Sequence, residues 1–320
     1  MAQHFLLSTQ ARTLSLAKVM RLSDDDAWAT FKDIRWASTE GVPVCPRCGS
    51  LTSYELSDNR RFKCADCRHK FSVTSGTIFA SRKLPIRDIL AAIAIFVNGA
   101  KGHSALQLSR DLDVQYKTAF VLAHKIREAL GTVQALAEIS GEVAVDGAYF
   151  GGYIKPANRR EDRKDRRRKI YQTGKRQVVI VARELDGETA THVAKSEAEG
   201  VPFVLATVQP GTIVHADEAS HWDALHAKYL TKRINHSEAY SADGACTNMA
   251  ESFFSRLRRA EIGTHHHIAG PYLAGYAAEM AWREDNRRVS NGEQYLAATS
   301  AALAHPVSRQ WKGYWQRSGV

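Results

Sequence analysis

Two aspartates follow short apolar runs in the second half of the chain. Asp146 comes after residues 143–145, and Asp217 comes after residues 213–216. If the two runs are neighbouring strands of one sheet, the carboxylates emerge close together, and such a pair needs a cation or a shared proton between them. Hard oxygen ligands suit Mg²⁺ or Mn²⁺. The pair therefore predicts a divalent-metal site, although either aspartate alone is more often a turn residue.

Glu251 is the leading third acid. It lies in an expected helix over residues 247–259, in which Phe253 and Phe254 begin the apolar side. Glu251 and Arg258 are about two turns apart and share a face of this helix. Three carboxylates can hold two metal ions that a phosphate bridges, with the arginine placed for the phosphate. On spacing alone, an ordinary surface pair explains these two residues better.

Four of the five cysteines form two Cys-x-x-Cys pairs. Cys45 and Cys48 make the first pair, and Cys64 and Cys67 make the second. Four thiolates on two turns close a tetrahedral shell around Zn²⁺, and so small a module needs the metal in order to fold. Without a secretion signal, the pattern predicts a structural zinc ribbon rather than disulfides. Cys246 stands alone and predicts a small packed residue.

Residues 104–125 have the length and the central turn of a helix-turn-helix. Its second helix is expected to present Gln115, Lys117, His124 and Lys125 outward. Such side chains bond to bases or phosphates in a major groove. An ordinary three-helix bundle is the alternative, and the basic ribbon that precedes this segment favours DNA contact.

The charge of the chain also favours nucleic-acid binding. The formal net charge is +10 at pH 7, which attracts polyanions such as nucleic acid. A dense basic run, residues 159–169, contains Arg166, Arg167 and Arg168. Such a run is usually a solvated loop, but beside Asp146 it is also placed to follow DNA phosphates. We see no signal peptide and no apolar run long enough for a bilayer, and we expect a cytoplasmic, nucleoid-associated protein without membrane contact.

The elements that must position the acids alternate between strands and helices. Hydrophobic periodicity predicts the strands first, with Asp186 and Gly187 as a hairpin turn, and then long helices. The expected strands are 143–145, 177–185, 189–194, 211–216 and 232–235, and the expected helices are 198–208, 221–229, 247–259 and 271–288.

This order resembles the RNase-H-like fold of the DDE transposases, closest to the bacterial insertion-sequence group with an N-terminal zinc ribbon. The resemblance extends from the ribbon to Arg288, and its motifs are specific together and weak singly. Four stretches carry it: Cys-Pro-Arg-Cys-Gly; Asp146-Gly-Ala-Tyr-Phe-Gly-Gly152; His215-Ala-Asp217; and Asn248-x-x-Glu251-x-Phe-Phe-x-x-x-Arg258-Arg259 with Gly263-Thr-His-His-His267.

The resemblance implies an α/β fold and an enzyme that cuts and joins DNA. It assigns Asp146, Asp217 and Glu251 to Mg²⁺ or Mn²⁺, and it places Arg258 where lysine is commoner in the family. Asn248 stays open as a contributor, since some members place other residue types in the third acidic role. Arg259 is expected to contact phosphates. The partners implied are the terminal inverted repeats and target DNA, bound by an oligomer of the chain.

The expected organisation has five parts. A helical segment precedes the zinc ribbon, a helix-turn-helix-like domain follows, and a catalytic domain ends in a C-terminal extension. Two other functions compete with a transposase: a DNA-binding regulator without catalysis, and a hydrolytic nuclease of the same fold. The intact set of three acids argues against the regulator. The expected boundaries are 1–40, 41–80, 84–132, 140–290 and 291–320.

Overall fold

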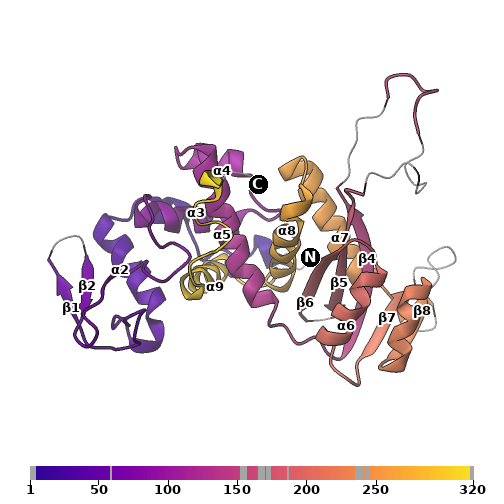
Figure 1. The fold of residues 1–320 in the computed structure, drawn as a ribbon, viewed down its shortest axis with the longest axis horizontal. Helices are drawn as coiled ribbons and strands as arrows, with labels where there is room; N and C mark the ends of the chain where they lie inside the picture. Colours follow the sequence, from indigo (N-terminus) through magenta and orange to yellow (C-terminus); the bar gives the residue numbers. More distant parts are fainter. Residues whose placement is uncertain are drawn as a thin grey trace. The chain divides into compact units, whose positions relative to one another are not determined.

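The computed structural model describes residues 5–57, 60–151, 157–164, 170, 174–185, 187–234, 241–242 and 245–317. The chain divides into two compact units (Figure 1). Met1–Val133 and Asn286–Val320 form the first unit, and Gln134–Asp285 form the second. The second unit is therefore an insertion in the sequence of the first. No helix of the described part is long and apolar enough to cross a membrane.

The first unit begins with helices α1 (Leu16–Met20) and α2 (Asp24–Arg35), followed by an antiparallel sheet. The side chain of Ser23 accepts a hydrogen bond from the Asp26 backbone and so caps α2. Aromatic side chains join α2 to the sheet: Trp28 of α2 stacks on Phe62 of β2, with ring centroids 6.0 Å apart. The ribbon therefore shares its core with the preceding helix. The strands are β1 (Ser53–Leu56), β2 (Arg61–Cys64) and β3 (Lys70–Ser72).

Three helices follow the ribbon: α3 (Ile86–Asn98), α4 (Ala105–Asp111) and α5 (Tyr116–Gln134). Ser104 caps α4 by accepting a hydrogen bond from the backbone of Gln107. Asp113, in the turn between α4 and α5, has φ of 50°, in the left-handed region that aspartate tolerates better than most residues. The two expected helices and the turn between them are therefore present, and their role as a DNA-binding helix-turn-helix stays a prediction.

Residues beyond 285 complete the first unit with helix α9 (Asn291–Ala304). Ser290 and Glu293 form a reciprocal capping box at its start. Asn291 ties the same turn to the N-terminal region, because its side-chain oxygen accepts from the backbone N–H groups of Thr13 and Leu14 at 2.9 and 2.8 Å. The sequence analysis predicted no helix here.

The second unit contains a five-stranded mixed sheet in the order β6-β5-β4-β7-β8. β4, β5 and β6 pair antiparallel, whereas β4, β7 and β8 run parallel. This confirms the expected α/β fold with an RNase-H-like mixed sheet. The strands are β4 (Glu142–Phe150), β5 (Gln177–Glu184), β6 (Thr189–Ala194), β7 (Ile213–Asp217) and β8 (Leu230–Ile234).

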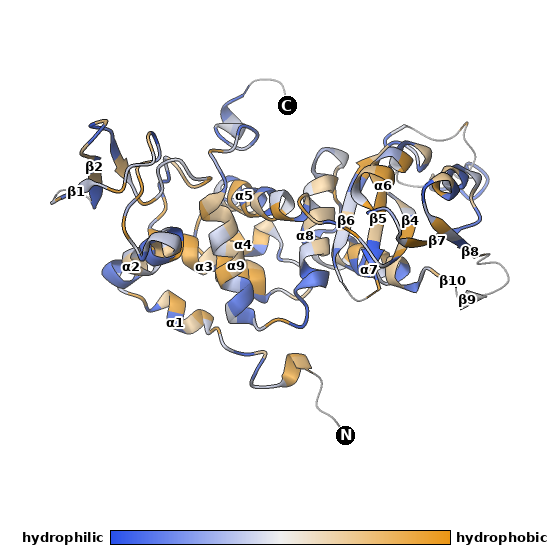
Figure 2. Ribbon diagram, turned by 90° about the horizontal axis from the view of Figure 1, so that it is seen from below, coloured by the Kyte–Doolittle hydropathy of each residue, from blue (hydrophilic) through white to orange (hydrophobic). Residues whose placement is uncertain are grey.

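Each face of this sheet has its own hydrophobic core, and the central strands appear strongly hydrophobic in Figure 2. Helix α6 (Val201–Thr207) and the 3-10 helix Ser220–Ala227 cover one face. Helices α7 (Asn248–Ala260) and α8 (Leu273–Asp285) cover the other. Two expectations were wrong in detail: β4 continues for four residues past Asp146, and the segment after Asp217 is a 3-10 helix rather than an α-helix.

Candidate active site and zinc ribbon

Asp146 and Asp217 lie on adjacent parallel strands of the second unit. Val143 is opposite Val214, and Ala144 is opposite His215. Continuing this register by two residues places Asp146 opposite Asp217. Side chains alternate between the faces of a strand, so both aspartates share the face of Ala144, which belongs to the core beneath α7. The expected pairing of the two acids is therefore built into the sheet.

Each aspartate is held by a local backbone contact. The Gly147 N–H donates to Asp146 Oδ1 at 2.7 Å, and the Ala219 N–H donates to Asp217 Oδ1 at 3.2 Å. Both carboxylates are half-buried. A short side-chain-to-backbone bond restricts the rotation of each carboxylate and leaves oxygens for other ligands.

A further acid, Glu197, lies beside this pair. Burial, together with the charges of Asp146 and Asp217, raises its pKa to about 7. The side chain of Glu197 packs against Gly147, where only glycine fits. A Cβ at position 147 would lie 2.5 Å from Glu197 Cγ. The Nε2 atom of His221 is 3.4 Å from Glu197 Oε2. The sequence analysis did not single out Glu197.

The direction of β6 explains how Glu197 reaches the pair. β6 runs in the same direction as β4 and β7, because two antiparallel pairings separate it from β4. Residues that follow β6 therefore emerge at the same end of the sheet as those that follow β4. The sequence does place Glu197 just after the predicted strand 189–194. That position indicates a site residue only if the order of the strands in the sheet is known.

Glu251 lies half-buried in the first turn of α7, whereas Asn248, the first residue of that helix, is exposed. Two anchors fix this turn. The N–H of Cys246 donates to Nδ1 of the buried His215 at 3.1 Å, and the Arg183 guanidinium donates to the Met249 carbonyl at 3.1 Å. The strand that carries Asp217 is thus tied to the segment that leads into α7.

Burial lowers the pKa of His215, which keeps the ring neutral near pH 7. With Nδ1 accepting from Cys246, the proton is on Nε2, which faces Glu142 Oε1 at 3.3 Å. This arrangement gives His215 a single tautomer. Cys246, expected as a packed residue, is half-buried and takes part through its backbone.

The basic residues of α7 have different surroundings. Arg256 pairs with the buried Glu284, which also binds Arg183 at 2.9 Å. Arg258 is exposed, and its guanidinium lies 5.9 Å from the ring centroid of Phe150, on the strand that carries Asp146. Arg259 is exposed. The predicted Arg166, Arg167 and Arg168 lie outside the described residues.

The four predicted cysteines come together in the first unit. Their sulfurs all lie within 4.8 Å of one another, with Cys45–Cys67 and Cys48–Cys64 at 3.6 Å. A tetrahedral Zn²⁺ with bonds of about 2.3 Å requires sulfurs roughly 3.8 Å apart, so the set fits zinc. Among the described residues, this is the only group of three or more His, Cys, Asp or Glu side chains gathered closely enough for one ion.

The two turns of this site repeat one backbone device. The residue after each pair, Gly49 and Arg68, is in the left-handed region, with φ of 76° and 60°. The turn lets the Gly49 N–H donate to the Cys45 carbonyl at 2.9 Å. Backbone N–H groups, chiefly that of Cys67, lower the pKa of the Cys64 thiol to about 6, which favours the thiolate that binds metal.

The predicted DNA-reading residues lie on α5 and at its start. Gln115 and Lys117 are exposed, as expected. Lys125 is half-buried. His124 was expected to point outward but is buried, with its ring stacked on Trp311 at 4.4 Å. The C-terminal residues that cover this side of α5 could not be foreseen from the helix pattern alone.

Comparison with known proteins settles the family. Residues 138–285 match the ISXO2-like transposase domain, and residues 22–70 match the transposase zinc-ribbon domain. The chain belongs to the ISXO2-like transposases with an N-terminal zinc ribbon. It is therefore a DNA transposase of the insertion-sequence type. The zinc-ribbon match and the four-cysteine cluster together confirm the prediction of a structural zinc site.

Individual relatives of this transposase are distant. An uncharacterized protein in transposable element ISH50 of Halobacterium salinarum is 24% identical over 295 residues, which cover 88% of this chain and 98% of the relative. Among solved structures, the Mos1 strand transfer complex aligns over 70% of this chain and 76% of that chain, with 11% identity and a TM-score of 0.24. At this TM-score the likeness says nothing about the fold.

Proposed function

We propose that Asp146, Asp217 and Glu251 form the active site at which this transposase cleaves DNA strands and joins them to target DNA. The register that places Asp146 opposite Asp217 on the face beneath α7 carries this proposal. Carboxylate oxygens suit Mg²⁺ or Mn²⁺. When bound, two such ions activate the attacking oxygen and stabilise the leaving one.

The protein's own residues would orient the reaction. Glu251 lies in the first turn of α7, where the helix dipole favours a negative charge, and His215 and Arg183 fix that turn. Arg258, above the end of β4, would bind the DNA phosphate that approaches the acids. Arg259 and the predicted Arg166, Arg167 and Arg168 would contact the DNA backbone, and such contacts carry little sequence information.

The first unit would recognise the terminal inverted repeats. Gln115 and Lys117 are exposed at the start of α5, where side chains of a recognition helix contact base edges. The zinc ribbon adds positive charge, and the DNA complex would contain more than one copy of the chain. Sequence specificity would therefore belong to the first unit and strand chemistry to the second.

The test uses purified Asp146→Asn, Asp217→Asn and Glu251→Gln proteins with terminal-repeat DNA. Each should lose cleavage by several orders of magnitude while repeat binding stays near wild type. Mn²⁺ binding, measured by calorimetry, should weaken in the same variants. The matched control is Glu218→Gln, an exposed acid next to Asp217, which should change neither. Cleavage by Asp217→Asn at the wild-type rate would refute the assignment.

The products separate the two competing functions. A regulator binds the repeats but cuts nothing, and a hydrolytic nuclease cuts but leaves no joined product. Insertion of a labelled repeat end into a circular plasmid should occur with the wild-type protein and not with Glu251→Gln. Cutting without insertion would favour the nuclease.

A further inference from the structure

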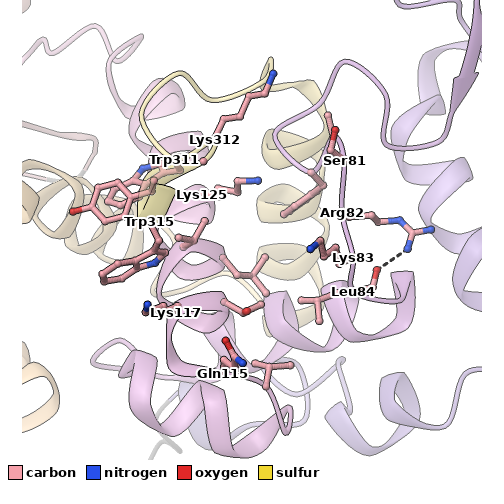
Figure 3. A pocket seen from close by; sticks show the side chains of 18 of the residues that line it. Ser81, Arg82, Lys83, Leu84, Gln115, Lys117, Lys125, Trp311, Lys312 and Trp315 are labelled. Carbon is pink, nitrogen blue, oxygen red and sulfur yellow. Dashed lines mark hydrogen bonds between the residues drawn. The ribbon is translucent and has the colours of Figure 1, made fainter. Parts of the chain in front are cut away.

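A pocket of about 640 Å³ lies in the first unit beside the N-terminal half of α5. That volume is in the range of small-molecule sites. Three segments form its walls: residues 79–84, one stripe of α5, and the C-terminal residues 311–316 (Figure 3). Lys117, Val121 and Lys125, spaced by one helical turn, make the α5 wall.

The lining of this pocket is strongly basic. The described residues that line it include five lysine and arginine side chains and no acid. Lys83 and Lys125 point into the pocket from opposite walls (Figure 3). The five are Arg82, Lys83, Lys117, Lys125 and Lys312. Cations gathered without a matching acid select an anionic ligand.

The pocket is an unfavourable environment for the charged form of Lys125. Its ammonium is partly withdrawn from water, and desolvation lowers its pKa despite the opposing effect of Glu128 on the same helix. An anion in the pocket would restore the favourable surroundings that the charged ammonium has in water.

The C-terminal wall is aromatic and supplies an open ring. Trp311 is buried against His124, whereas Trp315 is 45% exposed. The ring of Trp315 is supported edge-on by Phe120 at 5.9 Å, and Lys117 Nζ lies 5.3 Å from its centroid. A supported, exposed indole next to lysines is the kind of surface on which nucleic-acid bases stack.

We propose that this pocket binds a nucleotide unit of DNA, with the base stacked on Trp315 and the phosphate held by Lys117, Lys125 and Lys312. Gln115 also lines the pocket, so the bound nucleotide would adjoin the residues that would read the repeat. A nucleotide would use both the exposed indole and the lysines, whereas a plain polyanion would use the lysines alone. That the nucleotide belongs to DNA rests on the proposed end-binding function, whereas nucleotide binding itself does not.

The experiment compares four ligands on the full-length protein at low salt. They are a short oligothymidylate, an abasic oligonucleotide of the same length, thymidine monophosphate and poly-glutamate. The wild type should bind the oligothymidylate about ten-fold more tightly than the abasic strand, since one stacked base accounts for that difference. Trp315→Ala should abolish the difference, and Trp315→Phe should keep most of it.

Lysine variants test the anionic half of the site. Lys125→Met should weaken the binding of both the oligothymidylate and the abasic strand. The control Lys18→Ala changes an exposed lysine of the same unit outside the pocket and should weaken the binding of neither. Circular dichroism establishes that the Trp315 variants remain folded. Asp217→Asn should bind like the wild type, which separates this site from the proposed active site.

Three outcomes would decide against the proposal or its DNA source. A preference for the base-bearing strand that survives in Trp315→Ala overturns it. Poly-glutamate that binds as tightly as oligothymidylate shows a polyanion surface and also overturns it. Thymidine monophosphate that binds with the same dependence on Trp315, while the oligothymidylate shows none, supports a nucleotide site and overturns the assignment to DNA.

Discussion

Gln134 and Asp285, the first and last residues of the second unit, are joined by a hydrogen bond of 2.7 Å from Gln134 Nε2 to Asp285 Oδ2. The same amide donates to the Thr189 carbonyl at 3.0 Å, and the Thr189 N–H donates to Asp285 at 3.3 Å. The chain therefore enters and leaves the second unit at one place, next to the start of β6.

This contact predicts a pH dependence of stability. Burial raises the pKa of Asp285 from its usual 3.8 to about 6. The folded state favours the protonated form of Asp285. Its contribution to the free energy of unfolding is therefore fully present below about pH 4 and is lost as the pH rises through 6. Asp285→Asn should be more stable than the wild type at pH 8, by on the order of 2 kcal/mol, and similar at pH 4. Urea denaturation at the two pH values measures this, and exposed Glu188→Gln should show no such trend.

His215 should act as a positioning residue through Cys246. His215→Ala removes the acceptor for the Cys246 N–H and frees the segment that leads to Glu251. We expect cleavage to fall by about ten- to a hundred-fold, with little change in repeat binding, because small displacements of catalytic groups are costly. The control His192→Ala alters an exposed histidine of β6. Equal loss of activity in both variants would contradict a specific role of His215.

The zinc site should stabilise the ribbon locally. Cys64→Ser removes one of four ligands, and we expect the purified protein to lose its single equivalent of zinc and the ribbon to unfold. The core of the second unit is separate, so its thermal transition should remain. Elemental analysis and calorimetry measure the two effects. Cys246→Ser, outside the cluster, should retain the metal.

The ion cluster of Arg183, Arg256 and Glu284 should be costly to break. Glu284→Ala leaves the buried Arg183 without its partner, and we expect a loss of about 3 kcal/mol in unfolding free energy. Glu161→Ala removes an exposed partner of Arg159 and should cost less than about 0.5 kcal/mol. A similar loss in both would mean that Arg183 gains nothing from its buried partner.

Features that depend on local interactions could be predicted from the sequence. The zinc ligands and the two strands β5 and β6, expected at 177–185 and 189–194, depend on neighbours within a few residues. The turn at Asp113 is equally local. Glu197 and the anchor between His215 and Cys246 depend on strand order and register, which no local pattern contains. The helix that begins at Asn291 has a capping box in the sequence, but its place in the first unit depends on contacts with Thr13 and Leu14.

The insertion has a consequence for gene expression. Because Asn286–Val320 complete the first unit, the ribosome must translate the whole second unit before that part of the first is available. A gene copy with a premature stop codon within the second unit thus yields a polypeptide without α9 and without the wall that carries Trp315. Such a product lacks part of the unit that we propose recognises the terminal repeats, so decayed copies should be poor competitors for the ends of intact elements.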